Sequence, residues 1–171
     1  MKQKYCLVDT NVPLTADKMN DSDSDLAGCA IKCLEQIQDI MQNYGLVLDS
    51  GIDSGRKIMG EYGKNLTKDK QSISYAFFMW ANDYLEHNYV TINETNGSYK
   101  EFPTNPELNS FDPADRKFIA VANSYKDKPI TIFQATDSKW LGFKEVLQTI
   151  GINIHFVCEE YAQKMYKKKM G

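Results

Sequence analysis

Residues 115–140 read DRKFIAVANSYKDKPITIFQATDSKW, and this stretch sets the fold class of the chain. Its first part places apolar side chains at helical spacing, which predicts a helix over about 112–125. An isoleucine-rich run then predicts a strand over 129–135, which ends at Thr136 and Asp137. A helix followed by a buried strand is the repeating unit of an α/β protein with a parallel sheet.

The same alternation extends along the rest of the chain. Short apolar runs predict further strands at 4–8, 46–50 and 152–157. Helical spacing predicts helices over about 20–45, 50–66, 72–88 and 140–151. The dipeptide Asn96-Gly97 between alternating residues predicts an inserted β-hairpin near residues 90–102. We therefore predict a three-layer α/β/α sandwich with a central, mostly parallel sheet and one added hairpin.

The composition indicates one folded domain over residues 1–165, followed by a basic, frayed tail at 166–171. The chain has 171 residues, of which 42% are hydrophobic and 25% charged, as in ordinary globular proteins. Its net charge of -3 lacks the basic excess that is common in nucleic-acid binders. Contact with nucleic acid would therefore need a local basic patch, or a metal ion that offsets the acids.

Membrane association and export are not expected from the sequence. No apolar run approaches the roughly 20 residues that are needed to span a bilayer. Asp9 also comes too early for the N-terminus to hold the apolar region of a signal peptide. These observations predict a cytoplasmic protein with no membrane contact.

The four cysteines are expected to be reduced packing residues. They form no CxxC pair, although Cys29 and Cys33 would lie one helical turn apart. A structural zinc site needs four suitable ligands, and the chain has only two histidines.

Three aspartates are expected to meet at one edge of the predicted sheet. Asp9 and Asp137 each follow a strand, and Asp115 opens the helix that precedes the second of these strands. Because a helix runs antiparallel to the strand after it, the start of that helix lies at the edge where parallel strands end. Carboxylates this close repel one another unless a cation offsets them. Mg²⁺ or Mn²⁺ suits such oxygen ligands, and could bind a phosphate and activate water.

Four segments together resemble the motifs of the PIN-domain nucleases. They read VDTNV at 8–12, IMGEYGKNL at 58–66, DRKFIAVA at 115–122 and ATDSKW at 135–140. They occur in the order found in that family and span nearly the whole chain. The longer pattern EFP…FDPADRKFIAVA also resembles a bacterial PIN subgroup of unassigned function.

The resemblance implies a metal-dependent ribonuclease, whose catalytic and metal-binding acids would be Asp9, Glu61, Asp115 and Asp137. The neighbouring positions that would support them are Thr10, Asn11, Asp112 and Thr136. Many family members are toxins held by an antitoxin, so the resemblance implies an RNA substrate and allows for an antitoxin partner. Many members also carry a second acid two residues after the fourth, whereas this chain has Lys139 there, which weakens the case for a second metal ion.

Several of these residues also have a purely structural interpretation. Asp112, followed by Pro113, has the pattern of a helix N-cap, with Asp115 as its capping-box partner. Glu61 could be an exposed helix residue, and Asp9 and Asp137 could be ordinary strand-end or turn aspartates. Basic residues that could hold RNA phosphates, or simply be solvated surface charges, are Arg56, Arg116 and Lys139.

The leading functional hypothesis is a magnesium- or manganese-dependent endoribonuclease, with a toxin or defence effector as its candidate biological role. One alternative is a PIN-like protein that no longer cleaves and serves as a binding or scaffold protein. Another is a phosphatase of the haloacid-dehalogenase kind, although Asn11 stands where that family has its second aspartate. The apolar helix predicted over 72–88 is a candidate homodimer face.

Overall fold

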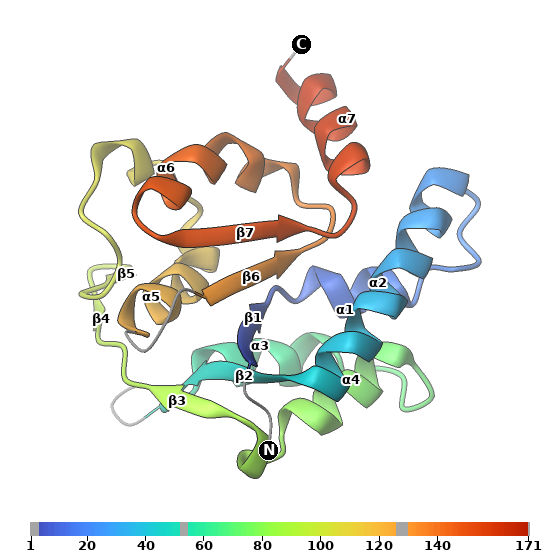
Figure 1. The fold of residues 1–171 in the computed structure, drawn as a ribbon, viewed down its shortest axis with the longest axis horizontal. Coiled ribbons are helices and arrows are strands. Elements are labelled where there is room, and N and C mark those ends of the chain that lie inside the picture. The colour runs from blue at the N-terminus through green and yellow to red at the C-terminus, as the bar shows by residue number, and fades with distance from the viewer. Residues whose placement is uncertain (1–3, 52–54, 126–129, 171) are drawn as a thin grey trace.

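The computed structural model describes residues 4–51, 55–125 and 130–170. Its central sheet has five strands, all parallel, in the order β3-β2-β1-β6-β7 (Figure 1). Helices flank this sheet, and the predicted three-layer α/β/α sandwich is confirmed. The strands are β1 (Lys4–Val8), β2 (Tyr44–Asp49), β3 (Asn88–Val90), β6 (Ile130–Gln134) and β7 (Ile152–Phe156).

The strand order creates one switch point, between β1 and β6. From β1 the chain adds β2 and β3 on one side, and it then returns to add β6 and β7 on the other. In open α/β sheets, the crevice outside the carboxyl ends of the strands at such a point is the usual ligand site. Asp9 follows β1 and Ala135 follows β6, so both segments that the sequence singled out leave the sheet there.

Strand burial follows position in the sheet. The last five residues of β2 are buried, as expected of a strand with both faces covered. β7 is an edge strand and alternates strictly between buried and exposed residues. The core therefore centres on β1, β2 and β6.

The five predicted helices are found in the predicted order, as α2 to α6, and two further helices, α1 and α7, were not predicted. The α-helices are α1 (Asn11–Ala16), α2 (Ser24–Asn43), α3 (Lys57–Asn65), α4 (Ile73–Ala81), α5 (Arg116–Ser124), α6 (Lys144–Thr149) and α7 (Glu159–Met170). Short 3₁₀ helices connect or extend them: η1 (Tyr84–Glu86), η2 (Pro106–Leu108), η3 (Pro113–Asp115) and η4 (Ser138–Phe143). Of the helix predicted over 50–66, residues 52–54 lie outside the described residues.

The helix predicted over 72–88 is wrong in its second half. α4 ends at Ala81, and the carboxylate of Asp83 then accepts the amide of Leu85 to start η1. The next residues form β3, which pairs with the end of β2. The predicted hairpin is confirmed as β4 (Glu94–Thr95) and β5 (Ser98–Tyr99), with both turn residues at positive φ.

The C-terminus is helical rather than frayed. α7 continues to Met170 through most of the segment that was expected to be a tail. Two glutamates lie in its first turn and three lysines in its last, an arrangement that interacts favourably with the helix dipole. α7 packs on η4 and on α2.

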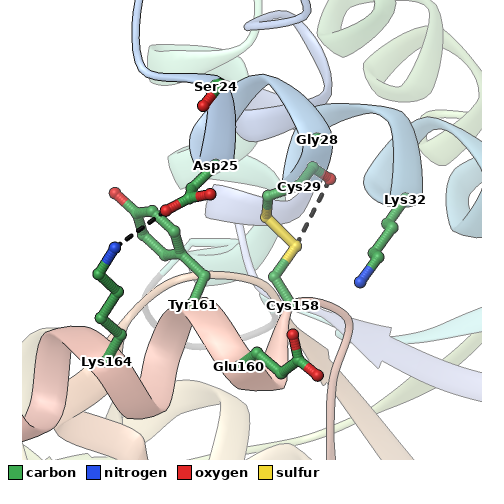
Figure 2. A pocket seen from close by; sticks show the side chains of 9 residues that line it. All are labelled: Ser24, Asp25, Gly28, Cys29, Lys32, Cys158, Glu160, Tyr161 and Lys164. Carbon is green, nitrogen blue, oxygen red and sulfur yellow. Dashed lines mark hydrogen bonds and ion pairs between the residues drawn. A yellow bond between two sulfur atoms is a disulfide. The ribbon is translucent and has the colours of Figure 1, made fainter.

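The prediction that all cysteines are reduced is wrong for one pair. Cys29 of α2 is bonded to Cys158, the residue before α7, across a sequence separation of 129 (Figure 2). Cys6 and Cys33 are buried and are not part of this disulfide, and the sulfur of Cys33 lies 4.0 Å from that of Cys158. The sequence does not reveal this pair, because the two cysteines come together only when α7 docks on α2.

Within the described residues, the structure has no helix whose length and apolar character would let it cross a membrane.

Candidate metal centre

Asp9 lies at the switch point and joins the ends of the two central strands. Its amide donates to the carbonyl of Phe133 at 2.9 Å, which extends the β1–β6 ladder by one residue. Its Oδ2 accepts the amide of Asn11 at 3.0 Å. The Asn11 Oδ1 in turn accepts the amide of Ala135, at 3.1 Å. Asp9 is thus held in a fixed position, and only 6% of it is exposed.

Glu61 reaches the same edge from α3, whose start is fixed by a buried aspartate. Both oxygens of Asp49, at the end of β2, accept amides of the first turn of α3, from Lys57 at 2.5 Å and from Ile58 at 2.9 Å. One helical turn later, the hydroxyl of Tyr62 donates to the carbonyl of Val8. These contacts position α3 beside the end of β1.

Both carboxylate oxygens of Glu61 are engaged in this position. Oε2 accepts the hydroxyl of Thr10. Oε1 lies 2.7 Å from the ammonium nitrogen of Lys117. The supporting role expected for Thr10 is therefore directed at Glu61.

Asp115 sits at the junction of η3 and α5. It occupies the N-cap position of α5 but makes no side-chain cap hydrogen bond. Its Oδ2 instead accepts the indole N–H of Trp140, at 3.3 Å. Because Trp140 belongs to η4, this hydrogen bond ties the third acidic segment to the fourth.

Asp137 caps η4, the 3₁₀ helix that follows β6. Its Oδ1 accepts the amide of Lys139 at 3.1 Å, and its own amide donates to Oε1 of Gln134 at 3.4 Å. Thr136, beside it, is partly buried. Oδ1 of Asp137 thus has the capping role of a turn aspartate, whereas Oδ2 has no such role.

The electrostatics show that the four acids share one site. The pKa of Asp9 is raised from its ordinary 3.8 to about 8, first by burial and then by the charges of Asp115, Glu61 and Asp137, against the lowering effect of the hydrogen bond from the Asn11 amide. The pKa of Asp115 is raised to about 6, first by burial and then by Asp137. The charges of three other segments therefore act on Asp9 and disfavour its ionisation.

Asp112 behaves differently from these acids, as its N-cap pattern predicts. Its Oδ1 accepts the amide of Ala114 at 3.0 Å, and Pro113 takes the first helical position of η3. Its Oδ2 lies 3.2 Å from the ammonium of Lys139. These two hydrogen bonds lower the pKa of Asp112, so it stays ionised.

The basic residues proposed to hold RNA divide into two groups. Lys139 lies at the rim, where its contact with Asp112 leaves its side chain 60% exposed. Arg56 lies over the ring of Tyr84 and donates to its hydroxyl. Arg116 donates to the carbonyls of Phe111 and Asn109 and to the hydroxyl of Ser98. The two arginines therefore bind neighbouring segments of the chain.

Sequence reasoning missed three residues of this centre: Lys117, Trp140 and Gln134. Lys117 is only 8% exposed, although it occupies a helix that is otherwise apolar on its buried side. A lysine inside such an apolar run is a usable signal, because a buried lysine needs a partner. The sequence gives no comparable signal for Trp140, whose contact depends on the path of η4.

The acids of this site offer oxygen ligands, the kind that a hard divalent cation prefers. Among the described residues, the ligand atoms that gather in threes within 4.8 Å of one another are the sulfurs of Cys29, Cys33 and Cys158. Asp9, Asp115 and Asp137 each use one carboxylate oxygen in the contacts described, and within residues 4–51, 55–125 and 130–170 the other makes no hydrogen bond. Near Asp137, the buried Oγ of Ser138 also lacks a partner in the same part of the chain; Nε2 of Gln134 lacks one too, but it is a hydrogen-bond donor and not a ligand for a cation. Oxygen ligands that repel one another when ionised suit Mg²⁺ or Mn²⁺ better than a soft metal.

A pocket of about 320 Å³ lies elsewhere, beside the disulfide between α2 and α7 (Figure 2). Asp25 and Lys164 form an ion pair across it, at 2.9 Å. None of the four acids lines this pocket. It is therefore separate from the candidate metal centre.

Comparison of the chain with protein-family models, with curated proteins and with solved structures gave no match.

Proposed function

We propose that this protein is a metal-dependent endoribonuclease whose divalent ion is held by Asp9, Asp115 and Asp137. The observation that carries this proposal is the convergence of these carboxylates at the β1–β6 switch point, where Asp9 is buried and repelled by the other acids. Such an arrangement is unfavourable without a cation and favourable with one. The preference for RNA rests on the resemblance of the four sequence motifs to PIN-domain nucleases.

The chain's own residues have distinct parts in this proposal. A bound Mg²⁺ or Mn²⁺ would polarise a phosphate and lower the pKa of a water molecule. Asn11 keeps Asp9 in place by linking it to the end of β6, and Trp140 does the same for Asp115. Lys139, exposed at the rim, is the cation best placed to contact a phosphate of the substrate.

The test combines metal binding with cleavage. Mn²⁺ titration by calorimetry and a cleavage assay on a mixed RNA pool would be run on the wild type, Asp9→Asn and Asp115→Asn. The matched control is Asp25→Asn, which changes an exposed aspartate paired with Lys164. We expect the first two variants to lose metal binding and cleavage, and the control to keep both.

The outcomes separate the alternatives. Wild-type protein that binds Mn²⁺ but cleaves neither RNA nor DNA would support the binding or scaffold protein instead. Cleavage of DNA alone would keep the metal centre and change the substrate. If the wild type binds no Mn²⁺ and Asp9→Asn behaves like it, the proposal is wrong. A toxin role would show as growth arrest on expression, relieved by Asp9→Asn or by a bound antitoxin.

A further inference from the structure

Lys117 brings a positive charge into the middle of the acidic site. Its side chain is 10% exposed, and its ammonium lies 2.7 Å from Oε1 of Glu61, whose side chain is 24% exposed. The same ammonium donates to the carbonyl of Ala114, in the turn just before α5. It also lies 5.2 Å from the ring centre of Phe118. Three contacts thus hold this cation in place.

Glu61 differs from the other three acids in how its oxygens are used. Thr10 donates to one oxygen and Lys117 pairs with the other. Asp9, Asp115 and Asp137 each keep one oxygen without a hydrogen bond inside the described ranges. A metal ion bound by Glu61 would have to share an oxygen that Thr10 or Lys117 already engages, and at Oε1 it would lie beside the Lys117 ammonium.

The position of the ammonium also matters to a second metal ion. Two-metal sites place their ions about 4 Å apart, and both ions need carboxylate ligands. A second ion bound through Glu61 would lie beside the Lys117 ammonium and be repelled by it.

We propose that the Lys117 ammonium pairs with Glu61 and so keeps Glu61 from binding a metal ion. The site then binds a single divalent ion, through Asp9, Asp115 and Asp137. This inference rests on the proposed function, because it assumes that the acidic site binds metal. It assigns Lys117 as a positioning residue, which acts through Glu61.

The test is the number of Mn²⁺ ions bound per chain. Calorimetry gives the stoichiometry, and electron paramagnetic resonance distinguishes an isolated Mn²⁺ from a spin-coupled pair. We expect the wild type to bind one ion, Lys117→Met to bind two as a coupled pair, and Lys117→Met with Glu61→Gln to bind one again. Lys57→Met is the matched control, because Lys57 pairs with Glu94 at the same distance of 2.7 Å without contacting the acidic site.

Glu61→Gln alone gives a second test, which does not depend on whether Lys117→Met folds. We expect this variant to bind one Mn²⁺ with less than a threefold change in affinity, whereas a true ligand would cost far more. Circular dichroism and thermal unfolding would confirm that each variant is folded.

Different experimental results would overturn the role of Lys117 and the proposed function. Two ions in the wild type, one ion in folded Lys117→Met, or a large loss of affinity in Glu61→Gln would overturn the role of Lys117 and leave the metal site standing. No bound ion in the wild type would overturn both.

Discussion

Two aspartates within one turn have separate roles. The carboxylate of Asp112 accepts the amide of Ala114 and pairs with Lys139. The carboxylate of Asp115 does not cap its own helix and instead accepts the indole N–H of Trp140. The sequence predicted the cap, because Asp-Pro before an apolar run is a helix-start pattern. It left the orientation of Asp115 open, because that depends on where η4 places the indole.

This difference predicts opposite effects of two substitutions. Asp112→Ala should lower the free energy of unfolding by about 0.5–2 kcal/mol, as expected for a lost N-cap, and leave Mn²⁺ binding nearly unchanged. Asp115→Asn should abolish Mn²⁺ binding and metal-dependent cleavage with little loss of stability. Urea unfolding and calorimetry would measure these effects. The reverse pattern would show that the two roles have been exchanged.

At the scale of elements, segments with a clear hydrophobic pattern or turn signal were predictable, and segments placed by tertiary pairing were not. Strands β1, β6 and β7 and helix α2 follow from periodicity and turn signals. β3 has three residues, and its position follows from pairing with β2 rather than from its own sequence. After Asn82 and Asp83, the residues Tyr84 and Leu85 keep the helical spacing from Ala81, so the pattern alone could not show that the helix stops at Ala81.

The packing of β2 against η1 depends on a glycine. A β-carbon on Gly45 would lie 2.1 Å from the carbonyl oxygen of Glu86 and 2.7 Å from the ring of Tyr5. Since backbone atoms cannot yield cheaply, Gly45→Ala should destabilise the fold by about 1–3 kcal/mol. Gly28→Ala in α2 is the control, because nothing lies within 4 Å of its added carbon. That variant should be neutral or more stable by up to about 1 kcal/mol in the same urea titration.

At the scale of the whole molecule, the acidic site should make the stability of the fold depend on pH. The folded pKa values of Asp9, about 8, and Asp115, about 6, lie above the ordinary value of 3.8. Between about pH 4 and pH 8 the folded state therefore holds more protons than the unfolded state, so the free energy of unfolding should fall as pH rises.

Thermal unfolding in EDTA would test this dependence. The melting temperature should decrease from pH 5 to pH 8, and Asp9→Asn should remove most of the decrease above pH 6. Adding Mn²⁺ should raise the melting temperature most at high pH, where binding displaces the fewest protons. A wild-type melting temperature that is independent of pH would contradict the raised pKa values of Asp9 and Asp115.

The Cys29–Cys158 bond also determines how the molecule can come apart under force. It closes most of the chain into a covalent ring that contains β2, β3, β6 and β7, whereas β1 lies outside it. A pull on the two termini of the oxidised protein can therefore draw out only β1, α1, the start of α2 and α7. β1 is the central strand and is followed by Asp9, so drawing it out would remove the middle of the sheet together with the first proposed metal ligand. The ring would remain closed, and the extended length would stay far short of that of the reduced chain.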